Sequence, residues 1–361
     1  MTKLFSPLSI KSITLKNRIG ISPMCQYMSV DGYANDWHLV HLGSRAIGGA
    51  GLIITEACAV EPNGRISPDC LGLYYDSHIE YLARITAFIK KYGAIPGIQL
   101  AHAGRKGSSI APFKGLGRSK RSYLTKENGG FDIFAPSSIP FEPNAIIPHE
   151  LTIEQIHKLI SQFGQCAKRA LKAGFQWLEI HAAHGYLINS FYSPLANQRQ
   201  DQYGGSFDNR IRFLIEVIES VKANWSDEYP ISVRLSITDH VIGGFTIDDS
   251  VKLAKILKSQ GIDLIDCSSG HVVKEQSLPS NDLKFQIDYA KTIKHEADIL
   301  TMAVGNIDSA KFAAYVIDEN YADIALIARA AIKNPYFAFN AALELGITDT
   351  ITLPQNYTYA I

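Results

Sequence analysis

The chain has 361 residues, of which 46% are hydrophobic, and its 35 basic and 35 acidic side chains give zero net charge. This composition is typical of a globular protein with a large core. Balanced charge without a long basic block argues against a nucleic acid or a membrane surface as partner. The basic run at 118–121 (RSKR) is typical of a solvated loop. No apolar run is long enough to span a membrane.

The cysteines and the N-terminus indicate the cellular compartment. The five cysteines lack the CxxC spacing of a structural zinc site, and their odd number argues against a disulfide framework. The first residues, MTKLFSPLSI, contain no signal-peptide core. We therefore expect a cytoplasmic protein.

Strand-like and helix-like segments alternate along the chain, after a small hairpin predicted at 10–15. Strands are predicted at 17–22, 51–55, 95–100, 175–180, 231–235, 264–267, 300–304 and 324–328. Helices are predicted at 38–47, 81–92, 152–173, 209–225, 248–259, 286–295, 310–320 and 334–345. The clearest helix start is Thr152 with Gln155 three residues later, the pattern of a capping box.

Strands that are each followed by a helix or a long connection predict a (β/α)8 TIM barrel, an α/β fold. A doubly wound sheet is the alternative, but no GxGxxG motif opens the helix after an early strand. Residues 104–150 are rich in Gly, Pro and Ser and predict a long excursion after the third strand, a length that is usually functional. We expect residues 1–361 to form a single domain.

The segment LEIHAAHGY (178–186) is the main candidate site. His181, His184 and Tyr186 follow an apolar strand, and in α/β barrels the carboxyl ends of strands carry the chemistry. Two histidines three residues apart are compatible with metal binding on a helix, although no third ligand stands out. Two imidazoles and a phenol also suit an electron-rich oxygen, such as a carbonyl that becomes an enolate.

Two arginines lie within or at the end of apolar strands. Arg234 lies within ISVRLSI, where a buried guanidinium needs an anionic partner. That partner is either Glu179 or Asp266 on a neighbouring strand, or an anionic cofactor. Arg329 ends the last strand and, with the backbone at Gly305, predicts a phosphate site at the loops of strands seven and eight.

Five long motifs carry a family resemblance that covers nearly the whole chain. They are PMCQY (23–27), WHLVHLGSRAIGGAGLIITE (37–56), GIQLAHAGRK (97–106), EIHAAHGYLINSFYSPLANQRQDQYGGSFDNRIRF (179–213) and VRLS (233–236). The chain resembles the Old Yellow Enzyme family of FMN-dependent ene-reductases. Cys25 and Tyr27 are similar to the pair found in its bacterial thermophilic-like, or YqjM-like, subgroup.

The resemblance implies a noncovalently bound FMN inside the barrel. Ser22, Pro23, Met24 and Cys25 would line the flavin, with Ala57 and Gln99 near its ring. Arg234 would stabilise the reduced anion at the pyrimidine end, and the phosphate would be bound by Gly305, Ala328 and Arg329. His181 and His184 would hold the substrate carbonyl oxygen, and Tyr27 would contact the substrate. Tyr186 would donate the proton, and Cys25 would tune the flavin potential.

The implied reaction is a ping-pong transfer from NADH or NADPH through FMN to the β-carbon of an α,β-unsaturated carbonyl compound. Nitro compounds or quinones are alternative acceptors. Two different classes also fit the residues: a metal-dependent lyase or aldolase barrel that uses HAAH as ligands, and a flavin-binding sensor or storage protein. Larger relatives that act on dienoyl-CoA or trimethylamine add an iron–sulfur domain, for which this chain has no cysteine cluster.

Three features of the chain depart from the family pattern. Ala328 stands where the family usually has glycine, and Gln176-Trp177 replaces a small or hydrophobic pair. The subgroup usually carries a C-terminal arginine that reaches a neighbouring subunit's active site, whereas this chain ends in LPQNYTYAI. Tyr357 or Tyr359 is the candidate substitute, and the resemblance implies a homodimer or homotetramer.

Overall fold

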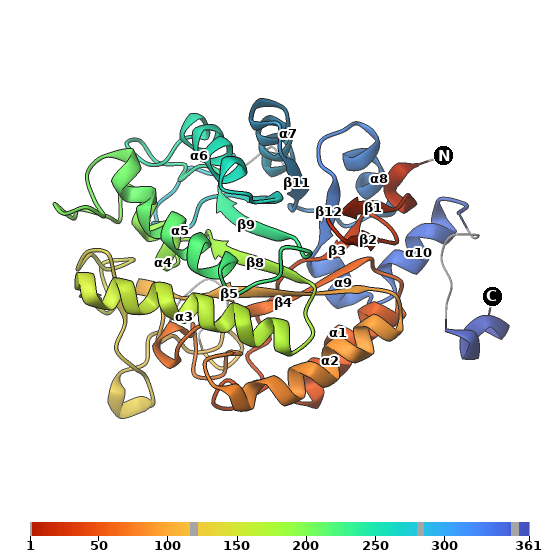
Figure 1. Ribbon diagram of the computed structural model, residues 1–361, viewed down its shortest axis with the longest axis horizontal. Coiled ribbons are helices and arrows are strands. Elements are labelled where there is room, and N and C mark those ends of the chain that lie inside the picture. Colours follow the sequence, from red (N-terminus) through yellow and green to blue (C-terminus); the bar gives the residue numbers. More distant parts are fainter. Residues whose placement is uncertain (1, 116–121, 280–284, 348–353, 361) are drawn as a thin grey trace.

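The computed structural model describes residues 2–115, 122–279, 285–347 and 354–360. Parallel strands close into a barrel in the order β10-β11-β12-β3-β4-β5-β8-β9 (Figure 1). Their bounds are β3 Ile19–Ile21, β4 Leu52–Ala59, β5 Ile95–Ala101, β8 Trp177–Ala182, β9 Ile231–Ser236, β10 Leu264–Ser268, β11 Leu300–Ala303 and β12 Ile324–Ile327. The (β/α)8 barrel prediction is confirmed, and the doubly wound alternative is wrong because the sheet closes on itself.

Helices surround the strands (Figure 1). They are α1 Asp36–Ile47, α2 Ile79–Lys91, α3 Ile153–Lys172, α5 Phe207–Lys222, α6 Ile247–Ser259, α7 Phe285–Ala297, α8 Ala310–Asp318 and α10 Phe337–Glu344. The capping box at the start of α3 is present, because Gln155 N–H donates to Thr152 Oγ1 over 3.2 Å and Thr152 N–H donates to Gln155 Oε1 over 2.8 Å. Within the described residues, no helix is long and apolar enough to cross a membrane.

The barrel interior has an apolar floor and a polar layer above it. The predicted hairpin is formed by β1 (Leu8–Ile10) and β2 (Ile13–Leu15), whose side chains pack against residues from the amino ends of the barrel strands. Further along the strands, Gln99 pairs in register with Glu179, and Arg234 with Asp266. These buried polar side chains lie on the way to the carboxyl ends, where the site is expected.

Three details differ from the sequence predictions. Strand β4 continues to Ala59 through an irregularity between Ile54 and Ala57, so Ala57 lies inside the strand rather than after it. Two short helices were not predicted, α4 (Leu187–Tyr192) and α9 (Arg329–Lys333), each directly after a barrel strand or its turn. The excursion after β5 contains a two-stranded sheet, β6 (Phe134–Ala135) and β7 (His149–Glu150). The basic run at 118–121 lies outside the described residues.

Candidate active site

A tight turn between β8 and α4 brings the three predicted rings together. His184 and Gly185 both adopt left-handed backbone conformations, with φ of 60° and 71°. A Cβ on Gly185 would lie 2.3 Å from the carbonyl oxygen of His271, so only glycine fits there. The ring centroid of His181 lies 5.2 Å from that of His184 and 5.0 Å from that of Tyr186. The structure thus assembles the cluster that the sequence pattern predicted.

Both histidines of this cluster are neutral. Burial lowers the pKa of His181 and of His184 well below the usual range, and the nearby Arg234 cation lowers both further. His181 Nδ1 lies 3.1 Å from the backbone N–H of Ala183 and accepts its hydrogen bond, which leaves the ring proton on Nε2. His184 Nε2 lies 2.6 Å from Ser268 Oγ. The pair offers hydrogen bonds to a ligand without offering positive charge.

A buried lysine supports the cluster from the side. Lys106 Nζ donates to the carbonyl oxygens of His184 over 2.6 Å and of His271 over 3.0 Å. It also lies 5.3 Å from the ring centroid of Tyr186. Lys106 belongs to the GIQLAHAGRK motif, but the sequence patterns assigned it no role. Its place shortly after a barrel strand was the signal that could have found it.

The loop after β3 carries Cys25 and Tyr27 to the same wall. Both pack with Tyr186 against a small buried cluster. Burial, and then the Glu56 carboxylate, raise the pKa of Cys25 to about 12, so its thiol stays protonated at neutral pH. Glu56 Oε2 accepts from the backbone N–H of Gln26 over 3.0 Å, which fixes the loop between the two side chains.

Arg234 of β9 contacts β10 and the residue that follows β3. Its Nη1 donates to Ser22 Oγ over 3.3 Å, and its Nε lies 3.3 Å from Asp266 Oδ2. Of the two carboxylates that the sequence offered, Asp266 is therefore the ion-pair partner. Glu179 instead accepts hydrogen bonds from Gln99 Nε2 over 2.8 Å and from Ser232 Oγ over 3.2 Å.

A cavity of about 880 Å³ extends from this layer to the loops after β11 and β12. That volume lies within the range of sites for cofactor-sized ligands. At one end it is lined by His184 and Arg234, and at the other by Gly305, Ala328 and Arg329. Gly305 has φ of 144°, a conformation that favours glycine. Further lining residues, which no sequence pattern singled out, are Gln286, Lys333 and Asn334.

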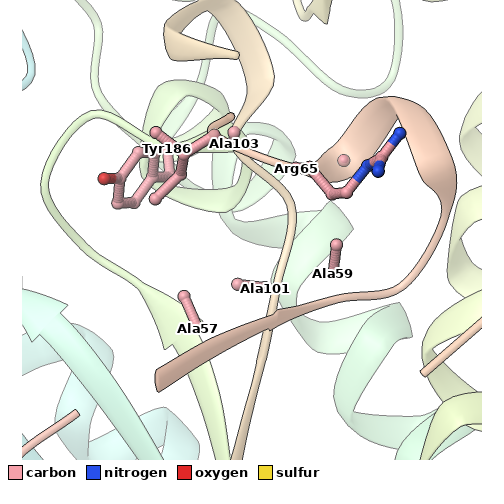
Figure 2. A pocket seen from close by; sticks show the side chains of 8 residues that line it. Ala57, Ala59, Arg65, Ala101, Ala103 and Tyr186 are labelled. Atoms are coloured by element: carbon pink, nitrogen blue, oxygen red, sulfur yellow. The ribbon is translucent and has the colours of Figure 1, made fainter. Parts of the chain in front are cut away.

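A second, much smaller void lies behind Tyr186 (Figure 2). At about 10 Å³ it has space for roughly one water molecule. Ala57 and Ala59 of β4 and Ala101 of β5 form one wall, and the Tyr186 hydroxyl points away from Arg65 on the far side (Figure 2). These small side chains leave room for the tyrosine ring.

The remaining predicted residues fall into two groups. Pro23 and Met24 follow β3, and Ala57 pairs with Gln99 across β4 and β5, so these reach the barrel mouth or its interior. Tyr357 and Tyr359 are exposed, with 41% and 88% of their surface accessible, in a short 3-10 segment near the C-terminus (Figure 1). No group of three or more His, Cys, Asp or Glu side chains gathers as a metal site in the part of the chain that the structure describes.

The fold is a (β/α)8 barrel with a cofactor-sized cavity at the carboxyl ends of its strands, and comparisons with known proteins identify the family. Residues 3–346 match the NADH:flavin oxidoreductase / NADH oxidase family. NADPH dehydrogenases of Bacillus velezensis and Bacillus subtilis are each 45% identical over 348 residues, which cover 95% of both chains. Morphinone reductase is 25% identical with a TM-score of 0.78, covering 95% of this chain and 90% of that one.

The chain belongs to the NADH:flavin oxidoreductase / NADH oxidase family, and the Old Yellow Enzyme resemblance is confirmed. It is an oxidoreductase that uses FMN with a nicotinamide electron donor. The residues fit such a group, because the cavity joins the Arg234 guanidinium to a glycine-containing loop at its other end.

Proposed function

We propose that the protein reduces the C=C bond of α,β-unsaturated carbonyl compounds with electrons from NAD(P)H. The cluster of two neutral imidazoles and one phenol beside the large cavity carries this proposal. Neutral donors can stabilise the negative charge that develops on a substrate oxygen during the reaction.

FMN supplies the hydride chemistry when bound, and the chain's residues would position it. Arg234 would lie by the pyrimidine end, and the phosphate would be held by Gly305, Ala328 and Arg329. Ser22, Pro23, Met24, Cys25, Ala57 and Gln99 would line the ring. The positions of these residues around one cavity and one barrel mouth support this assignment.

The substrate would be oriented by hydrogen bonds to its carbonyl oxygen from His181 and His184. Tyr27 would contact the substrate, and Tyr186 would give its hydroxyl proton to the α-carbon. Lys106 would keep the His184 turn and the tyrosine ring in place through its two carbonyl contacts. The Cys25 thiol would tune the flavin from beside the same wall.

Tyr186→Phe tests the proton donor. We expect reoxidation of the reduced flavin by 2-cyclohexen-1-one to slow about 10²- to 10⁴-fold, because general-acid catalysis is lost. Reduction of the flavin by NADPH should be unchanged. Stopped-flow absorbance measures both half-reactions, with the exposed Tyr75→Phe as control. Equal loss in both half-reactions would show that Tyr186 is not the proton donor.

The same variant separates the alternative acceptors. Quinones and nitro compounds need no proton on carbon, so their reaction with reduced flavin should not depend on the Tyr186 hydroxyl. If the wild type reacts with quinones far faster than with any enone, the ene-reductase proposal fails. If the yellow protein is never bleached by NAD(P)H, a binding-only role replaces it.

We also propose that residues 1–361 act as one domain and that the protein forms a homodimer or homotetramer. Support comes from exposed apolar side chains on and beside α1, where Val30, Trp37 and Val40 are 69%, 49% and 68% accessible. Light scattering should give a mass of two or four chains for the wild type and a lower mass for Val40→Lys. A wild-type monomer would contradict the proposal.

Cytoplasmic location stays a prediction.

A further inference from the structure

Two carboxyl groups and one guanidinium share the polar layer beneath the large cavity. Glu179 on β8 and Asp266 on β10 are fully buried, and Arg234 on β9 lies between them in the strand order. Of these three side chains, Arg234 lines the cavity and the two acids do not. Below this layer the barrel is closed by Trp177, Met302 and the other apolar residues of the floor. The charge of the two carboxyls is therefore not screened by water from below.

Glu179 and Asp266 differ in their hydrogen-bond partners. Glu179 accepts from Gln99 and Ser232, which are both neutral. Asp266 Oδ2 lies 3.3 Å from Arg234 Nε. With both acids ionised, however, neither Asp266 oxygen accepts a hydrogen bond from any described residue. A buried carboxylate without a donor is costly. A proton on Glu179 relieves that cost, because the protonated acid becomes a donor to Asp266.

Among the described residues, the titratable groups next to the pair along β8 and β10 are uncharged. His181, two residues along β8 from Glu179, is neutral because burial lowers its pKa. Cys267, next to Asp266 on β10, is a thiol because burial and Asp266 raise its pKa. The facing positions on β5 and β11 are Gln99 and Met302.

The two acids therefore differ in which of them holds a proton. Burial, and then repulsion by Asp266, raise the pKa of Glu179, while Arg234 opposes the rise. Burial also raises the pKa of Asp266, but Arg234 and the hydrogen bond from Glu179 both lower it. The bonds from Gln99 and Ser232 favour the charged form of Glu179, but both donors are neutral, whereas Asp266 contacts the Arg234 cation. The proton therefore belongs on Glu179.

We propose that Glu179, whose hydrogen-bond donors Gln99 and Ser232 are neutral, holds the proton of the Glu179–Asp266 pair and that loss of this proton lowers the reduction potential of the bound flavin. One cation then faces one carboxylate, Asp266, under the flavin at neutral pH. When Glu179 ionises, the layer gains a negative charge, which opposes the charge of reduced flavin. Glu179 is a positioning residue in this scheme, since it acts through Arg234. The inference rests on the family's FMN and not on the acceptor that reoxidises it.

The midpoint potential of bound FMN, measured from pH 6 to pH 10, tests this in three proteins. Glu179→Gln mimics the protonated acid, so it should match the wild type at pH 7. Above the pKa of Glu179 in the oxidised protein, the equilibrium constant for reducing the wild type should fall relative to the variant, by up to about tenfold per pH unit, until Glu179 is ionised in the reduced protein as well. Asp266→Asn should raise the potential at pH 7, because it frees the guanidinium to stabilise the reduced anion.

Infrared difference spectroscopy gives a direct readout that needs no activity. The wild type should show the carbonyl band of a buried protonated carboxyl at pH 7, and that band should vanish at pH 10. Glu179→Gln should lack the band. Asp239→Asn, which alters another buried acid bonded to Ser193 and the Phe245 N–H, should keep it.

Three outcomes would overturn the inference. The first is absence of the infrared band in the wild type. The second is a midpoint potential of Glu179→Gln that differs from that of the wild type at pH 7. The third is a midpoint potential of Asp266→Asn equal to that of the wild type at pH 7, which would place the proton on Asp266. Failure of enone reduction would leave all three readouts intact, so the two proposals fail separately. The infrared spectrum of the wild type can be measured even if a variant does not fold, and absence of the band there is enough to overturn the inference.

Discussion

Burial decides the chemistry of the two site histidines. Because burial holds their pKa values well below 6.5, both rings stay neutral on either side of that pH. The KM for a neutral enone should therefore not rise as the pH falls through 6.5, the ordinary pKa of histidine. Steady-state kinetics at saturating NADPH on both sides of that pH measure the effect. A sigmoid rise in KM centred near 6.5 would mean that at least one imidazole is charged in the working enzyme.

Removing either histidine should weaken the binding of phenols, whose oxygen resembles an enolate oxygen. We expect His181→Ala and His184→Ala to lower affinity about 10- to 100-fold each, since a hydrogen bond to a charged group contributes about 1.5–3 kcal/mol. Absorbance titration of the flavin with p-hydroxybenzaldehyde measures the change. His149→Ala, which alters an exposed histidine away from the cluster, serves as control. Unchanged affinity in either site variant would contradict its role.

At the scale of elements, the turn between β8 and α4 positions the whole cluster. Gly185→Ala keeps every reactive side chain but places a Cβ against the His271 carbonyl in a left-handed conformation. The strain costs about 1–3 kcal/mol or is relieved by moving His184 and Tyr186. We expect both a lower melting temperature and weaker phenol binding.

The matched control for that turn is Gly205→Ala. Gly205 has φ of 77°, but a Cβ there meets nothing within 4 Å. It should lower the melting temperature slightly and leave phenol binding unchanged. Equal effects of both substitutions on phenol binding would show that the close contact at Gly185 does not position the cluster.

Apolar runs and helix caps were sufficient to predict the barrel from the sequence. Each strand is a short buried run followed by a turn, and the Thr152–Gln155 capping box formed as expected. Helix α4 was missed because all six of its residues are buried, so it has no polar face and no helical period. The end of β4 was misplaced because polar Glu56 interrupts its apolar run while remaining inside the strand.

Site residues that lie close together in the sequence could be predicted, whereas contacts between different strands could not. His181, His184 and Tyr186 lie within six residues, so one turn brings them together. The partner of Arg234 could not be chosen between Glu179 and Asp266, because strand register decides it. Register pairs Arg234 with Asp266 and with His181, and Glu179 with Ser232.

Across the whole molecule, buried thiols make stability depend on alkaline pH. Burial raises the pKa of Cys25 and Cys166 to about 12, and that of Cys58, Cys70 and Cys267 well above the usual value. The folded chain therefore holds thiol protons that the unfolded chain releases near pH 9. Their stabilising contribution is complete below that pH and declines as the pH rises toward the folded-state values.

The free energy of unfolding should accordingly fall between pH 8.5 and pH 10.5. Lys16 opposes this trend, since burial lowers its pKa to about 8 and its neutral form favours the folded state in that range. Five thiols outweigh one amine, so the net slope is negative. Urea denaturation of the FMN-bound protein across the range measures it. Cys166→Ala should make the slope shallower than in the wild type, whereas Lys16→Met should make it steeper, and a positive slope in the wild type would contradict the assignment of the thiols.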